Sequence, residues 1–167
     1  VTIQAQILDL LEKLQAQRSM AILLITHDLG IVARMAQRVA VMYAGEIVEI
    51  ADRDIFFAAP QHPYAQKLFQ ALPSPAKRGA ALSVIVGQVP ALTGEFVGCR
   101  FAERCEFAYA RCRTEQPQLI AIPGDSAAQR IARLVRCHLR ERGPALADAR
   151  EAAALAGEAR ALAAAAS

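Results

Sequence analysis

Tryptophan is absent from this sequence, and aromatic residues make up only 5% of its 167 residues. The hydrophobic fraction is nevertheless 54%, because alanine is abundant, above all near the end of the chain. Alanine buries little area per residue, so the core is smaller than this fraction suggests. A chain of this length supports one ordinary domain, or one small domain with an appendage.

Long apolar runs are also missing. No segment approaches the roughly 18 consecutive apolar residues that a membrane-spanning helix needs, which excludes a transmembrane protein. The first residues carry neither an initiator methionine nor the basic start and apolar segment of a secretory signal. We therefore expect a cytoplasmic fragment of a longer protein.

A strong excess of one charge is missing as well. The net charge is +3, and arginine alternates with acidic residues along the chain. Nucleic-acid binding needs a more basic surface, so we expect no nucleic-acid partner. The four cysteines stand in a chain without an export signal, and we expect reduced thiols rather than a disulfide framework. Two roles for the four cysteines remain possible: they bind a metal, or they are unligated thiols.

Helix and strand patterns alternate in the first part of the chain. Apolar residues at three- and four-residue steps predict an amphipathic helix over residues 3–17. The unalternated apolar run 21–25 predicts a strand buried on both faces of a parallel sheet. Thr26 or Asp28 can cap the next helix. A helix followed by a buried strand predicts an α/β fold.

A hairpin and two short helices are predicted next. Residues 38–43 and 46–50 have strand patterns separated by Ala44-Gly45. Residues 54–57 are predicted to form a short helix before Pro60, and Pro63 suits the first position of a helix over 63–72.

Proline, glycine and charge concentrate in residues 73–79, which predicts a domain boundary. We accordingly predict a first domain over 1–72 and a small, loop-rich cysteine domain over 73–142. The second domain begins with a strand candidate at 82–86. Residues 143–167 are alanine-rich and predict a marginally helical tail.

His27 directly follows the predicted buried strand. Ligands of open α/β sheets bind at the carboxyl ends of strands, where helix N-termini also offer donors to anions. An imidazole there can hydrogen-bond a phosphate. The alternative is a loop histidine that only caps the next helix, and position alone favours this alternative.

The four cysteines have the spacing Cys-x5-Cys-x6-Cys-x24-Cys. They are Cys99, Cys105, Cys112 and Cys137. Thiolates select Zn²⁺ or iron–sulfur clusters, but this spacing matches neither a zinc ribbon nor a familiar ferredoxin. From the residues alone, unligated thiols, zinc and an iron–sulfur cluster all stay open.

Several segments in order resemble one family. They are VTIQAQI (1–7), LLITHDLG (23–30), RVAVMYAG (38–45) and PQHPY (60–64). They are similar to the second half of the ATP-binding subunit of bacterial dipeptide/oligopeptide ABC transporters, and the resemblance runs from Val1 to about Leu139. The last segment is similar to the His-Pro-Tyr motif of the peptide-transporter branch, although Ala65 replaces the usual threonine.

The resemblance implies a partial ABC-ATPase nucleotide-binding domain over 1–72, with His27 as the switch histidine that contacts the γ-phosphate of ATP. It implies peptide import driven by ATP and Mg²⁺ in the complete subunit. The implied partners are a second nucleotide-binding subunit and transmembrane permease subunits, which would hold the protein at the inner face of the cell membrane.

The sequence holds no Gly-Lys pair, which a phosphate-binding P-loop requires. By the resemblance, the signature loop and the Walker B carboxylate would lie before Val1. Phosphoryl transfer depends on such positioning and charge neutralisation, so we predict no ATPase activity for this chain alone. The alternative function is a stand-alone, non-catalytic metal-binding or interaction module from a truncated gene.

The cysteine segment resembles the C-terminal extension of the same subunits. The resemblance rests on GCRFAERC (98–105), Cys112, Pro117 and RCH (136–138). It implies that the four cysteines bind a [4Fe–4S] cluster, with zinc as the alternative. We expect a structural cluster, because metal-binding free energy becomes folding free energy in a small, loop-rich unit.

Other polar residues have plainer predicted roles. Tyr43, Tyr64 and His62 are expected to be structural, and so is His138, although it could replace a cysteine as a ligand. The hairpin carboxylates are expected to form a solvated face; they are Glu46 and Glu49. The arginines near the cysteines either offset thiolate charge or are solvated; they are Arg100, Arg104, Arg111 and Arg113.

Overall fold

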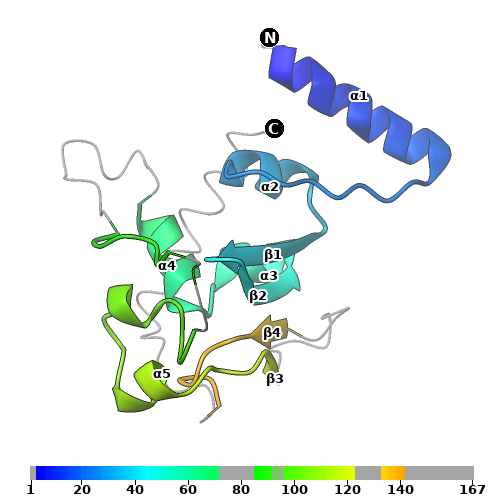
Figure 1. Cartoon of the computed structure of the whole chain (residues 1–167). Helices are drawn as coiled ribbons and strands as arrows, with labels where there is room; N and C mark the ends of the chain where they lie inside the picture. Colours follow the sequence, from blue (N-terminus) through cyan, green and yellow to red (C-terminus); the bar gives the residue numbers. More distant parts are fainter. Residues whose placement is uncertain (1–2, 72–84, 92, 94–95, 123–132, 142–167) are drawn as a thin grey trace.

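The computed structural model describes residues 3–71, 85–91, 93, 96–122 and 133–141 (Figure 1). The predicted linker at 73–79 and the predicted tail at 143–167 lie outside these residues. Of the strand candidate at 82–86, only Ile85 and Val86 are described, and they form no strand.

Helix α1 (Ile3–Arg18) confirms the first predicted helix and projects away from the other elements in Figure 1. None of its described side chains is buried. Arg34 of α2 (Leu29–Met35) joins the two helices by ion pairs with Asp9 and Glu12, the latter at 3.0 Å. The apolar residues of α1 are thus exposed or only partly buried by the described part of the chain.

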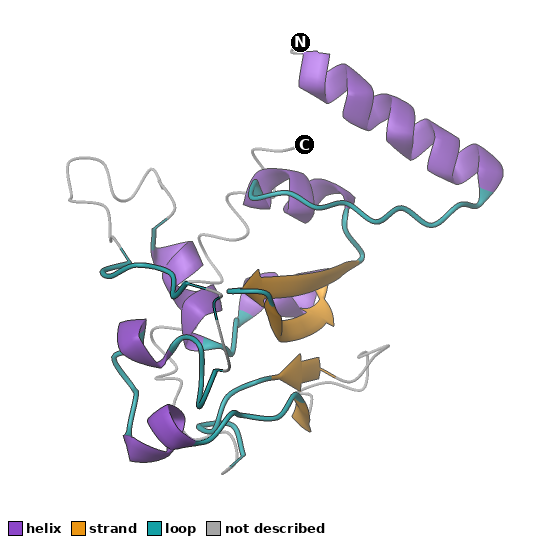
Figure 2. Cartoon of the chain, in the orientation of Figure 1, coloured by secondary structure: helices purple, strands orange, loops and turns teal. Residues whose placement is uncertain are grey.

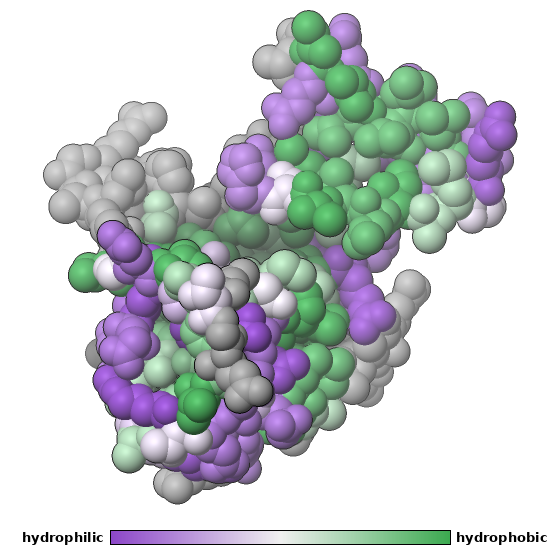
Figure 3. Space-filling view, viewed as in Figure 1, coloured by the Kyte–Doolittle hydropathy of each residue, from purple (hydrophilic) through white to green (hydrophobic). Residues whose placement is uncertain are grey.

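The strand predicted at residues 21–25 is wrong for this structure. The segment is an irregular connection in which Leu23 and Ile25 are 89% and 90% exposed. An apolar run forms a buried strand only where neighbouring strands pair with it, and no described strand lies beside this one. Together with α1 it gives the broad apolar surface at the upper right of Figure 3.

Four strands form one antiparallel sheet in the order β1-β2-β4-β3. Strands β1 (Arg38–Tyr43) and β2 (Glu46–Asp52) confirm the predicted hairpin. Strands β3 (Ile120–Ile122) and β4 (Arg133–Val135) are three residues each, and neither was predicted. The fold is thus mixed α and β, but the predicted parallel sheet is wrong for the described residues, whose strand pairs are all antiparallel.

The turn between β1 and β2 consists of two residues with left-handed backbone conformations. Ala44 and Gly45 have φ angles of 46° and 80°. Positive φ at both central residues is what a two-residue type I′ turn requires, and its twist matches that of the two strands.

Helices α3 (Arg53–Ala58) and α4 (Pro63–Gln70) follow the hairpin as predicted. Their aromatic side chains make the centre of the core, where Phe56 and Phe57 lie 5.4 and 5.3 Å from Phe69 between ring centroids. Phe101 joins this core from the cysteine segment. None of the helices in the described ranges has the length and hydropathy of a membrane span.

Most of the described chain after α4 is loop (Figure 2), interrupted by the 3-10 helix η2 (Ala102–Arg104), helix α5 (Ala110–Thr114) and the two short strands. Strand β4 pairs with β2, so the segments on either side of the predicted boundary share one sheet. The division into 1–72, 73–142 and 143–167 stays a prediction.

Candidate functional site

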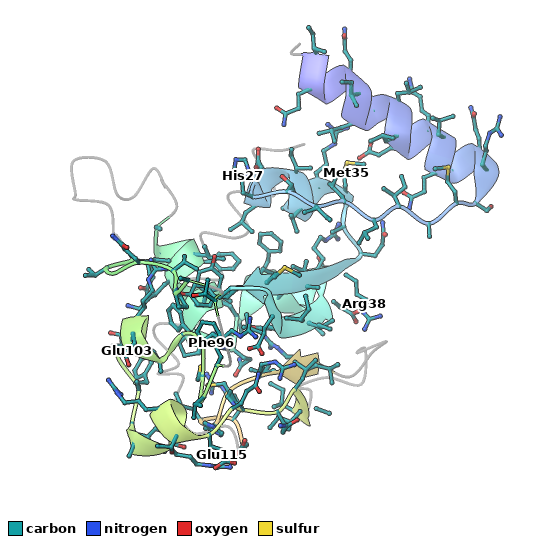
Figure 4. The ribbon with its side chains drawn as sticks, viewed as in Figure 1. His27, Met35, Arg38, Phe96, Glu103 and Glu115 are labelled. Atoms are coloured by element: carbon teal, nitrogen blue, oxygen red, sulfur yellow. The ribbon has the colours of Figure 1, made fainter. Side chains whose placement is uncertain are left out.

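The four cysteines line one pocket, together with His62, His138 and apolar side chains such as Phe101 and Leu139. They reach it from four places: the loop before η2, the end of η2, helix α5 and the loop after β4. Figure 4 draws the side chains of this part of the chain and labels Glu103 of η2 and Glu115, which follows α5. The fold therefore brings together thiols that the sequence separates by as many as 38 positions.

Gly98 allows two of the cysteine loops to meet. Its φ is +88°, and a Cβ there would lie 2.6 Å from the carbonyl oxygen of Cys112. The amide of the next residue, Cys99, donates to that same oxygen at 2.7 Å. Only glycine combines this backbone conformation with so close an approach.

The environment of three of the four thiols opposes their ionisation. Burial raises the pKa of Cys105 and of Cys137 to about 11, and it also raises the pKa of Cys99. The other cysteines add to each shift, because neighbouring thiolates repel one another. All four are free cysteines. A positive centre such as a metal ion would offset this cost, because metals bind the thiolate form.

Among the described residues, no three His, Cys, Asp or Glu side chains are arranged to hold a metal ion. The imidazole ring of His138 is held by two hydrogen bonds. Its Nδ1 lies 3.0 Å from a carboxylate oxygen of Glu141, and its Nε2 lies 2.9 Å from the carbonyl oxygen of Glu115. Both ring nitrogens are engaged, which agrees with the structural role predicted for His138, and its replacement of a cysteine as a ligand stays a prediction.

His62 is buried and caps α4, which explains the His-Pro-Tyr motif. Its Nδ1 accepts from the amide of Tyr64 at 3.1 Å, and Pro63 occupies the first helical position. Tyr64 packs on Tyr43 with 4.7 Å between ring centroids. These contacts confirm the structural roles predicted for His62, Tyr43 and Tyr64.

We expect His62 to make the metal-free chain less stable in acid. Burial, helped by the charge of Arg140, lowers the pKa of His62 from 6.5 to about 3. Between these values the unfolded chain binds a proton that the folded chain does not, so stability falls as pH drops from about 6.5 toward 3. The limiting slope is about 1.4 kcal/mol per pH unit.

Urea midpoints measured at about pH 7 and about pH 5 test this expectation against His62→Asn, because asparagine keeps the cap but does not titrate. The wild-type chain should lose more stability on acidification than the variant. Equal losses in the two proteins would contradict the assignment.

Glu49 is one of the two hairpin carboxylates whose exposure the sequence predicts wrongly. It is 0% exposed rather than solvated. Its carboxylate accepts from the backbone amide of His62 and from Nη2 of Arg133, both at 2.7 Å, and from the amide of Gln61 at 3.0 Å. Arg133 lies 84 residues away in sequence, so no local pattern could have indicated the pair.

Glu46 is not solvated either, since its side chain is only 13% exposed. It forms an ion pair with Arg100 at 3.3 Å and accepts from the amide group of Gln116. Both predicted solvated carboxylates of the hairpin are therefore in contact with the chain that follows residue 96.

His27 does not join the cysteine pocket. It is exposed in the loop before α2, where Figure 4 labels it. Asp28, not His27, caps the helix, since its carboxylate accepts from the amide of Gly30 at 2.8 Å. The structure thus leaves the His27 side chain without the capping role that the plainer alternative gave it, and its phosphate contact stays a prediction.

This chain is similar to known ATP-binding proteins of peptide transporters. Residues 48–112 match the family model described as the oligopeptide/dipeptide transporter, C-terminal region. A probable peptide ABC transporter ATP-binding protein of Sinorhizobium fredii is 50% identical over 130 residues, which are 77% of this chain and 39% of that protein. The dipeptide transport ATP-binding protein DppD of Escherichia coli is 48% identical over 119 residues, which are 71% of this chain and 36% of that protein.

A putative peptide import ATP-binding protein of Brucella ovis is 46% identical over 128 residues, covering 73% of this chain and 38% of that protein. The chain thus spans less than two fifths of the length of these relatives. The predicted resemblance is confirmed.

Proposed function

We propose, from the premise that this chain carries the C-terminal region of the oligopeptide/dipeptide transporters, that it is part of an ATP-binding subunit that drives peptide import. The observation that carries the proposal is the family match over residues 48–112, from β2 to α5, together with the similarity to peptide transporter ATP-binding proteins. In the complete subunit ATP hydrolysis would be coupled to transport through permease subunits and a second nucleotide-binding subunit. The protein would lie at the inner face of the membrane.

The exposed apolar surface supports a role within a larger unit. Six large apolar side chains of α1 and residues 21–25 are exposed, although their composition suits a packed helix and a covered strand; they are Ile3, Ile7, Leu10, Leu23, Leu24 and Ile25. Further polypeptide of a complete subunit would cover this surface. It would also supply the phosphate-binding loop and the Mg²⁺ ligand that this sequence lacks.

We propose that His27 is the switch histidine of that subunit. Its imidazole is exposed beside the N-terminus of α2 and has no capping role, so it is free to contact a phosphate. In the complete subunit, reconstituted with its permease subunits in vesicles, we expect His27→Ala to lower ATP hydrolysis about 10²-fold or more, as for loss of a transition-state donor. ATP binding should persist.

Peptide uptake and ATP hydrolysis are measured together in these vesicles. Asp54→Ala, at an exposed position of α3, serves as the matched control and should keep wild-type rates. Wild-type hydrolysis in His27→Ala would refute the switch assignment.

We propose that the cysteine pocket holds a [4Fe–4S] cluster. The donor set supports this, because four thiols line one pocket whose wall is otherwise largely apolar. Each thiolate of such a cluster binds a different iron, so the four sulfur atoms need not converge on one point. A single zinc ion needs that convergence, with each sulfur at about 2.3 Å from the metal. The cluster would serve as a structural link between the loops.

Anaerobically prepared protein should accordingly contain about four iron and four sulfide ions per chain and absorb broadly in the visible range. Cys105→Ser is expected to lose most of both, because a hydroxyl is a poor ligand for this cluster. Ser19→Ala, at an exposed position far from the pocket in sequence, should retain both. Stoichiometric zinc without iron would overturn the cluster.

A further inference from the structure

All four cysteines stand next to an arginine in the sequence, and three of these pairs share one target. They are Cys99-Arg100, Arg104-Cys105 and Arg136-Cys137. In the structure each of these arginines binds the same short segment, residues 43–48, which contains the β1–β2 turn and is called the turn segment below. Each of these arginines therefore connects a cysteine, its neighbour in sequence, to the turn segment, which it contacts in space.

Arg100 and Arg104 hold the tip of the hairpin. The Arg100 guanidinium donates to the carbonyl oxygen of Ala44 and forms the ion pair with Glu46. Arg104 donates to the hydroxyl of Tyr43 at 3.3 Å. Phe101 stands between the two arginines in sequence, and its ring meets Tyr43 edge-on at 5.1 Å between centroids.

Arg136 holds the beginning of β2. Its Nε donates to the carbonyl oxygen of Ile47 at 3.0 Å, and its backbone amide donates to that of Val48 at 2.9 Å. Cys137 follows directly and lines the pocket. A displacement of this cysteine loop would therefore move two hydrogen bonds of the turn segment.

The remaining cysteine provides a contrast. Cys112 also has arginine neighbours, but Arg111 pairs with Glu115 and Glu141, and Arg113 pairs with Glu103. Neither of these two arginines has a hydrogen bond or ion pair with the turn segment among the described contacts. The link to the hairpin is thus specific to three of the four arginine-flanked cysteine positions.

We propose that metal binding in the cysteine pocket is coupled to the ordering of the turn segment through Arg100, Arg104 and Arg136, which act as positioning residues. The inference rests on the proposed cluster. Fixing a cysteine fixes the backbone of its neighbour and so places the guanidinium against the hairpin. The coupling is reciprocal, so contacts at the turn segment strengthen metal binding by the same factor.

Hydrogen exchange on the full chain tests the coupling. The metal-free chain is compared with chain reconstituted anaerobically with ferrous iron and sulfide. We expect loading to slow exchange of the amides of residues 43–48 by about 5- to 150-fold. The double variant Arg100→Gln/Arg104→Gln should take up iron and lose most of this slowing, whereas Arg111→Gln, the matched control beside Cys112, should keep it.

The outcomes separate the two proposals. Iron uptake with unchanged exchange of the turn segment overturns the coupling and leaves the cluster standing. Failure of the wild-type chain to take up iron and sulfide overturns the cluster and the coupling with it.

A second variant tests the coupling if the double variant does not take up iron. Glu46→Gln keeps every cysteine and arginine but weakens the contact with Arg100, and its iron affinity in competition with a chelator should fall about fivefold or more. Asp54→Asn should match wild type, and equal affinities of all three proteins overturn the coupling.

Discussion

Replacing Glu49 with alanine is expected to lower the free energy of unfolding by about 3–5 kcal/mol, because it leaves the Arg133 guanidinium buried without its counter-ion. The two side chains are 0% and 5% exposed, so water cannot take the place of the carboxylate. The backbone amides of Gln61 and His62 lose their acceptor in the same step. One substitution therefore disturbs β2, the start of α4 and β4 together.

Urea unfolding followed by circular dichroism measures this loss. The matched control is Asp54→Ala, since Asp54 pairs with Arg53 at 2.8 Å but has an 83% exposed side chain. Exposed pairs contribute about 1 kcal/mol or less. The double variant Glu49→Leu/Arg133→Met should recover part of the loss, because it buries no unpaired charge. A Glu49→Ala chain as stable as the Asp54→Ala chain would refute the buried pair.

Gly98→Ala is expected to have an effect of similar size at the cysteine pocket. The left-handed backbone costs a residue with a Cβ about 1–2 kcal/mol. The new Cβ would also lie 2.6 Å from the Cys112 carbonyl oxygen, and relieving such overlap costs about 1–3 kcal/mol more. The hydrogen bond from Cys99 to that oxygen would have to open, and the two cysteine loops would separate.

Gly87→Ala is the control for this experiment. Gly87 has the same φ of +88°, but a Cβ there meets only the flexible side chain of Arg104, at 3.3 Å. The difference between the unfolding free energies of the two variants isolates the backbone overlap. We expect Gly98→Ala to be the less stable and to retain less iron after anaerobic reconstitution. Equal stability would show that the cysteine loops can part without cost.

The elements that the sequence predicted well are those specified by local signals. The Ala44-Gly45 turn between two strand patterns predicts the hairpin, and Pro63 predicts the start of α4, because both depend on conformations of neighbouring residues. The run 21–25 has the hydrophobicity of a covered strand, but a covered strand needs neighbouring strands, and none of the described strands pairs with this run. Three-residue strands such as β4 have no period long enough to detect.

The candidate site divides in the same way. The cysteines stand out by residue type, and the pocket brings all four together. The position of Glu49 in an alternating strand predicts a solvated side chain. Its burial depends on Arg133, far along the chain, and on the amides before α4, and no nearby residue reports either contact. Ion pairs between residues that are distant in the sequence are thus the feature of the site that local sequence patterns cannot predict.

The pairing of β4 with β2 has a consequence for anyone who shortens this protein. In a polypeptide that ends before the cysteine segment, β2 would be an exposed edge strand. Exposed edge strands have unpaired backbone groups that can pair with strands of other chains. The truncation would also leave the buried carboxylate of Glu49 without its ion pair to Arg133. Such a product is expected to aggregate rather than to behave as a smaller folded domain, so the hairpin and the cysteine loops must be expressed as one piece.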